Sequence, residues 1–138
     1  MSSKGQDTEN TGVSKQVEVL PATSGDYVVL ALNGKMVYEN ANIFAKELES
    51  KIREKGCYII DVDNLERLDS TGFGVLITLA KKVTSLEGQV GFKVSNEFLK
   101  ELFDIAKFDS VFPMAATQEA VWQIINGGFQ PRISLKQY

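Results

Sequence analysis

The sequence predicts an α/β protein with a mixed, partly parallel sheet of about five strands packed by about four helices. Short apolar runs typical of strands alternate along the chain with longer stretches of helical period. One run, Tyr58 to Val62, is almost continuously apolar, as expected of a strand covered on both faces. A length of 138 residues with 43% hydrophobic residues suits one domain with a real core.

The first half of the chain is expected to hold a hairpin, a helix and a central strand. Residues 1–15 are polar, with almost nothing apolar to bury, and predict a disordered tail. The apolar residues that define the first helix recur at spacings of three and four, and Gly56 is expected to end it. The predicted elements are a strand at 17–20, a turn at 21–26, a strand at 27–32, a helix at about 40–55 and a strand at 58–62.

The second half alternates helices with short strands. Asp69-Ser70-Thr71-Gly72 opens a helix that ends near Gly88, and Ser95-Asn96-Glu97 supplies capping residues for another. The remaining predicted elements are a strand at 90–94, a helix over 98–106, a strand near 111–112 and a helix at 117–125. The expected domain spans 16–127, and residues 128–138 are expected to form a C-terminal tail.

Composition argues against most enzyme classes and against nucleic acid as a direct partner. The chain has no histidine, the usual general base and a common metal ligand. A net charge of −3 and scattered lysines and arginines provide no basic stripe. No apolar run is long enough for a membrane span and no signal peptide is apparent, which predicts a cytoplasmic protein without membrane insertion. The single cysteine, Cys57, is expected to be a buried strand thiol, and no cofactor is expected.

The segment from Asp69 to Gly74 is the candidate functional site. It lies between a strand and a helix start, where open α/β sheets tend to bind their ligands. Asp, Ser and Thr are also the preferred helix caps, so a purely structural role is the simpler interpretation. A phosphate on Ser70 would nevertheless be tolerated, because helix N-termini favour anions. A partner matched to the neutral hydroxyl would then meet a desolvated charge.

Two segments of the chain form a recognisable pattern, Ile59-Ile60-Asp61-Val62-Asp63-Asn64-Leu65 and Leu68-Asp69-Ser70-Thr71-Gly72-Phe73-Gly74-Val75-Leu76. In these segments the chain resembles the STAS domain, named for sulphate transporters and anti-sigma factor antagonists. The resemblance extends over roughly Val17 to Ile125, including the downstream segment 98–106. Val37 stands where many relatives have Asp, and Phe73 where Leu is usual.

The resemblance implies a regulator that switches partners and performs no chemistry. Ser70 would be the phosphoacceptor, with Thr71 less favoured. The unphosphorylated antagonist would capture an anti-sigma factor serine kinase and so release a sigma factor that regulates transcription. Phosphorylation would block capture until a serine phosphatase reverses it. The implied partner-binding residues are Gly34, Lys35, Met36, Val37, Tyr38, Asp69, Ser70, Thr71, Gly72, Phe73 and Gly74.

Other interpretations remain open. The same domain could serve as a constitutive scaffold subunit of a signalling assembly or membrane-associated complex, and self-association is possible. A Ser70 nucleophile is disfavoured, because the G-x-S-x-G pattern and a histidine base are both missing. The acidic residues Asp61, Asp63, Glu66 and Asp69 are expected to lie in a solvated loop and not to bind a metal. Trp122 is expected to pack on the sheet.

Overall fold

The computed structural model describes residues 17–137, so the predicted N-terminal tail at 1–15 lies outside the described residues. It contains one five-stranded sheet in the order β1-β2-β3-β4-β5. The first pair is antiparallel and the other three pairs are parallel. The predicted α/β class with a mixed sheet is therefore confirmed. The elements are β1 (Val17–Ser24), β2 (Tyr27–Met36), η2 (Tyr38–Asn40), α1 (Ala41–Lys51), β3 (Cys57–Leu68), α2 (Ser70–Ser85), β4 (Gln89–Lys93), α3 (Glu97–Ile105), η3 (Phe108–Ser110), β5 (Met114–Ala115), α4 (Gln118–Asn126) and η4 (Leu135–Gln137).

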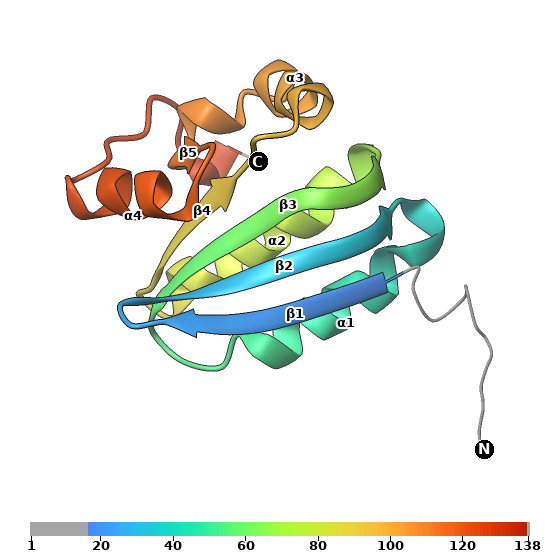
Figure 1. The fold of residues 1–138 in the computed structure, drawn as a ribbon, viewed down its shortest axis with the longest axis horizontal. Coiled ribbons are helices and arrows are strands. Elements are labelled where there is room, and N and C mark those ends of the chain that lie inside the picture. The colour runs from blue at the N-terminus through green and yellow to red at the C-terminus, as the bar shows by residue number, and fades with distance from the viewer. Residues whose placement is uncertain (1–16, 138) are drawn as a thin grey trace.

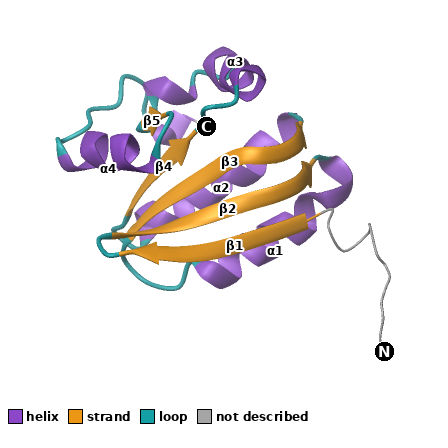
Figure 2. Cartoon of the chain, in the orientation of Figure 1, coloured by secondary structure: helices purple, strands orange, loops and turns teal. Residues whose placement is uncertain are grey.

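The helices lie on both faces of the sheet. Figure 1 shows α1 and α2 behind the first three strands, with α3, β5 and α4 gathered beyond β4. The opposite face of β2 and β3 packs against α4 through a second apolar cluster that includes Val29, Ile59, Val121 and Ile125. Because β3 has apolar contacts on both faces, its first residues form the continuous apolar run that the sequence indicated. Figure 2 shows the part of β1 and β2 that no helix covers on this side.

The main core lies between the sheet and helices α1, α2 and α3. Its largest fully buried side chains include four phenylalanines, Phe44, Phe92, Phe103 and Phe108. Three of these rings pack edge to face or tilted near the end of β4, with centroids 5.1 to 5.9 Å apart. This cluster fixes α3 against the start of α2, which is the region that carries the candidate site.

Two strands are longer than the sequence predicted. The predicted turn at 21–26 is wrong, because Pro21 to Ser24 continue β1 and only Gly25 and Asp26 turn. Proline is accepted there because β1 is an edge strand, which can leave an N–H position unused. The polar segment 63–67 also belongs to β3, with register shifts against β2 that turn Leu65 into the core.

Smaller differences concern the ends of elements. Helix α1 ends at Lys51, so Gly56 does not terminate it. The fifth strand lies at Met114–Ala115 and not at 111–112. Residues 128–137 fold back onto the domain, where Ile133 and Leu135 pack against the main core. Within residues 17–137, no helix combines the length and apolarity needed to cross a membrane.

Candidate functional site

Ser70 is the first residue of α2, directly after the end of β3. Its side chain is exposed, whereas Thr71 is half-buried. The helix cap is Asp69, whose carboxylate Oδ1 accepts a hydrogen bond from the Gly72 N–H at 2.9 Å. Among the described residues, none forms a hydrogen bond with the Ser70 hydroxyl. The structural role that the sequence left open is thus filled by Asp69, and the Ser70 hydroxyl remains accessible.

The Asp69 carboxylate also joins two segments that are far apart in sequence. Oδ2 accepts the backbone N–H of Tyr38 at 3.0 Å, and the Asp69 N–H donates to the Met36 carbonyl at 3.3 Å. The N–H of Gly72, followed by that of Tyr38, stabilises the ionised form and lowers the pKa of Asp69. One side chain therefore holds the end of β2 beside the start of α2.

Tyr38 is the most exposed large hydrophobic side chain in the described part of the chain, at 75% exposure. It lies in η2, and its backbone N–H donates a hydrogen bond to Asp69, the residue before Ser70. An exposed aromatic side chain and an accessible hydroxyl, linked through Asp69, are typical of a protein-binding surface. We call the set Tyr38, Asp69, Ser70, Thr71 and Gly74 the switch surface.

Several predicted partner-binding residues are buried and cannot contact a partner through their side chains. Met36 is fully buried and Val37 is 8% exposed, because both side chains pack inward at the end of β2. Val37 thus presents little of its side chain to solvent. Lys35 is half-buried, and Gly34 is buried in β2 with a φ of 113°, a backbone conformation that favours glycine.

The two glycines of the segment have different roles. A Cβ on Gly72 would lie 2.3 Å from the Met36 carbonyl oxygen and 2.6 Å from Leu68, so glycine permits α2 to pack against β2. Gly72 is buried, and its lack of a side chain is explained by this packing within the domain. Gly74 is exposed, and a Cβ there would meet nothing within 4 Å.

Phe73 points into the protein. Its ring packs edge to face on Phe103 and Phe108, with centroids 5.1 Å apart in both pairs. A phenylalanine at this position therefore anchors the first turn of α2 to α3 and η3. The segment from Asp69 to Gly74 thus alternates between residues that face solvent and residues that fix the helix start.

Sequence reasoning missed a second polar network near this end of the sheet. The Asp63 carboxylate accepts hydrogen bonds from Lys93 Nζ at 2.7 Å, from Ser95 Oγ at 2.6 Å, and from the backbone N–H groups of Ser95 and Asn96 at 2.7 and 2.9 Å. Burial alone would raise the pKa of Asp63, but these hydrogen bonds lower it to about 2.

Asp63 therefore secures the loop that leads from β4 into α3. Asp61 lies 3.6 Å from the same lysine nitrogen, so the expected solvated loop is wrong for these two residues, which sit in β3. No group of acidic, cysteine or histidine side chains within residues 17–137 could hold a metal ion. The sequence held a signal for this network. Asp61 and Asp63 are two residues apart, a spacing that places both side chains on one face of a strand.

Two other expectations are confirmed. Cys57 is buried in β3, and desolvation raises its pKa to about 11. Trp122 in α4 packs on Tyr27 of β2 with ring centroids 5.6 Å apart.

The fold and this helix start define a known class of domain. Residues 15–121 match the STAS domain model, and the chain belongs to the STAS domain family. The resemblance seen in the sequence is therefore confirmed over most of the chain.

Relatives within the family are named for sigma-factor regulation. The candidate anti-sigma factor antagonist BtrV of Bordetella bronchiseptica is 27% identical over 95 residues, which cover 67% of this chain and 81% of BtrV. An anti-sigma factor antagonist from Mycobacterium paratuberculosis superposes with a TM-score of 0.71 at 16% identity, covering 81% of this chain and 96% of the other.

The phosphorylated form of the Bacillus cell fate determinant SpoIIAA has a TM-score of 0.55 at 15% identity, covering 79% of this chain and 98% of SpoIIAA. These structures share the fold of this protein.

Proposed function

We propose that this protein is an anti-sigma factor antagonist whose switch surface binds an anti-sigma factor serine kinase when Ser70 is unphosphorylated. Capture of the kinase releases a sigma factor, and phosphorylation of Ser70 ends the capture until a serine phosphatase removes the phosphate. The antagonist supplies a binding surface and no catalysis. Family membership and the relatives named as anti-sigma factor antagonists support this proposal.

The observation that carries the proposal is the accessible Ser70 hydroxyl beside an independent cap. Because the Asp69 carboxylate already accepts a backbone N–H of the first turn, the Ser70 hydroxyl is not needed to cap α2. A kinase can therefore reach the hydroxyl without unwinding the helix. Thr71, which is half-buried, is the poorer acceptor. The solved structure of SpoIIAA in a phosphorylated form gives a precedent for phosphorylation on this fold.

The electrostatics of the switch surface suit a change of partner affinity without a change of fold. A phosphoserine adds about −1.5 to −2 charge at neutral pH. Here it would stand next to the ionised Asp69 carboxylate, which accepts the backbone N–H of Tyr38, the residue with the exposed ring. A partner that packs on this ring would have to desolvate both negative groups, which disfavours the complex. The positive end of α2 favours the same phosphate in the free protein.

The proposal is tested by affinity capture from native lysate, with the parent protein, Ser70→Asp and Thr78→Asp as baits. Thr78 is exposed on the same helix but lies two turns from its start, so Thr78→Asp is a matched charge control. We expect a small ATP-binding serine kinase on the parent and control baits and its loss from Ser70→Asp. Incubation of that kinase with ATP should phosphorylate the parent at Ser70, located by mass spectrometry, and leave Ser70→Ala unmodified.

Other results would contradict the proposal in different ways. Recovery of one large assembly by all three baits would identify a constitutive scaffold instead. Unchanged phosphorylation of Ser70→Ala would move the acceptor away from Ser70.

A further inference from the structure

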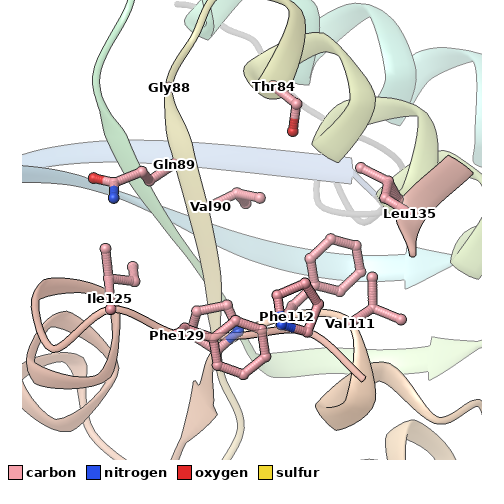
Figure 3. Close-up of a pocket in the computed structure, with 12 residues that line it drawn as sticks. Thr84, Gly88, Gln89, Val90, Val111, Phe112, Ile125, Phe129 and Leu135 are labelled. Atoms are coloured by element: carbon pink, nitrogen blue, oxygen red, sulfur yellow. The ribbon is translucent and has the colours of Figure 1, made fainter. Parts of the chain in front are cut away.

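A cavity of about 300 Å³ lies at the other end of α2 from Ser70. Its walls come from the last turn of α2, the start of β4, the segment before β5, the end of α4 and the returning C-terminal segment. Figure 3 shows Val90 and Ile125 on one side, Val111 and Leu135 on the other, and Phe129 at the base. These five parts of the chain thus surround one space that opens to solvent.

The described side chains that line the cavity are mostly apolar, and none is charged. Of the described residues around it, only Thr84 and Gln89 have polar side chains, and none carries a charge. In Figure 3 the Thr84 hydroxyl points towards the cavity, whereas the Gln89 amide points away from it. A charged ligand would lose its hydration here without gaining a partner. A neutral ligand with one hydrogen-bonding group would meet a matching surface.

The C-terminal segment is held in place while leaving this space open. The N–H groups of Arg132 and Ile133 both donate to the Ser110 carbonyl, at 2.7 and 3.0 Å, and Arg132 also contacts the Ser110 hydroxyl at 3.1 Å. The match to the family model ends at residue 121, so Phe129 and Leu135 extend beyond the part of the chain that matches. The segment thus adds a wall to the domain without filling the space behind it.

We propose that this cavity binds a neutral, mostly apolar small molecule, such as an aromatic or short aliphatic compound, with one group that hydrogen-bonds to Thr84. The volume lies at the lower end of the range of known ligand pockets, about 300 to 1,000 Å³. Protein interiors are normally close-packed, and an apolar surface gains dispersion contacts when an apolar group fills it. The proposed site is separate from the switch surface and does not depend on phosphorylation of Ser70.

The test uses N-phenyl-1-naphthylamine, a neutral aromatic amine whose fluorescence rises in apolar surroundings. The full chain should bind this probe saturably at one site. Thr84→Phe, which directs a ring into the cavity, should weaken the binding at least about tenfold. Thr78→Phe, the same change at an exposed position six residues earlier on α2, should leave it unchanged. Urea unfolding curves establish that both variants are folded.

A second measurement on the parent protein avoids any effect of substitution on folding. Backbone amide NMR shifts on addition of the probe should be largest around Gln89 to Gly91 and Gly128 to Phe129. The proposal is overturned if the parent shows no saturable binding, if Thr84→Phe binds as tightly as the parent, or if the shifts fall elsewhere.

Discussion

At the scale of single residues, Asp69 and Ser70 divide between them two tasks that neighbouring polar residues often share. Asp69 caps α2 and ties Tyr38 to the helix start, while Ser70 leaves its hydroxyl in solvent. Cap residues and accessible acceptors look alike in a sequence, because Asp and Ser are both favoured at helix starts. The structure separates them by showing which oxygen accepts the Gly72 N–H.

This division predicts unequal effects on stability at these adjacent positions. Asp69→Ala should cost about 1 to 2 kcal/mol of unfolding free energy, since it removes a cap and the link to Tyr38. Ser70→Ala should change it by less than about 0.5 kcal/mol, because the hydroxyl has no partner to lose. Urea unfolding followed by circular dichroism measures both. A cost at Ser70 equal to that at Asp69 would show that the serine also serves as a cap.

The accessible part of the site could be predicted from the sequence, and the buried part could not. Asp69-Ser70-Thr71-Gly72 indicated a helix start after a strand, which fixes Ser70 in space. Met36 and Val37 were expected at the partner-binding surface because the resemblance to the STAS domain implied it. Their burial depends on α2 packing across the end of β2, and a contact between segments so distant in sequence leaves no local pattern.

At the scale of elements, the contact between α2 and β2 depends on Gly72. The helix crosses so close to the strand that a methyl group at this position would overlap the Met36 carbonyl. The end of the strand and the start of the helix therefore form one rigid unit. That unit carries both Tyr38 and Ser70.

Two glycine substitutions on the same helix test this contact. Gly72→Ala should lower the unfolding free energy by about 2 to 3 kcal/mol, because the added carbon overpacks the contact. Gly74→Ala should raise it by about 0.5 to 1 kcal/mol, because its Cβ enters open space and alanine is the better helix former. Urea unfolding curves of both variants give their unfolding free energies, which can be compared through the midpoints if the m-values are equal. Equal effects at both positions would mean that helix propensity alone decides, without a steric contribution from β2.

The lengths of the elements show where sequence patterns mislead. Pro21 suggested a turn, but it lies on the edge strand β1, which pairs only with β2 in the sheet. Edge strands tolerate a proline because one side of the strand needs no hydrogen-bond donors. The polar run 63–67 suggested a loop. It continues β3 because Asp63 accepts a hydrogen bond from Lys93 and Leu65 is buried in the core. In both places the decisive partner lies on another element. Regular periods in α2 and α3, which depend on their own sequence, were assigned correctly.

At the scale of the whole molecule, the Asp63 network connects stability to pH. Its pKa of about 2 in the folded protein lies below the ordinary value of 3.8. A carboxyl whose pKa is lowered by folding contributes stability above its unfolded pKa and loses it as the pH falls through the folded pKa. Asp63 therefore contributes stability at neutral pH that disappears between about pH 4 and pH 2.

We expect the unfolding free energy of the parent protein to fall steeply over that interval. Asp63→Asn should be less stable at pH 6, and its curve should be flatter between pH 4 and pH 2. Urea titrations at half-unit pH steps measure both curves. If the unfolding free energies of the two proteins fell equally between pH 4 and pH 2, the acid sensitivity would come from other carboxyl groups.

The length of α2 sets how the two surfaces of this molecule relate to each other. Ser70 and Thr84 are fourteen residues apart on a continuous helix, which corresponds to about 20 Å along its axis. The Ser70 hydroxyl and the cavity are therefore separate sites that share no residue. Ligands of both can be present on one chain, and they can arrive in either order. Any effect of one on the affinity for the other would be transmitted through the domain between them, and it would be equal in both directions.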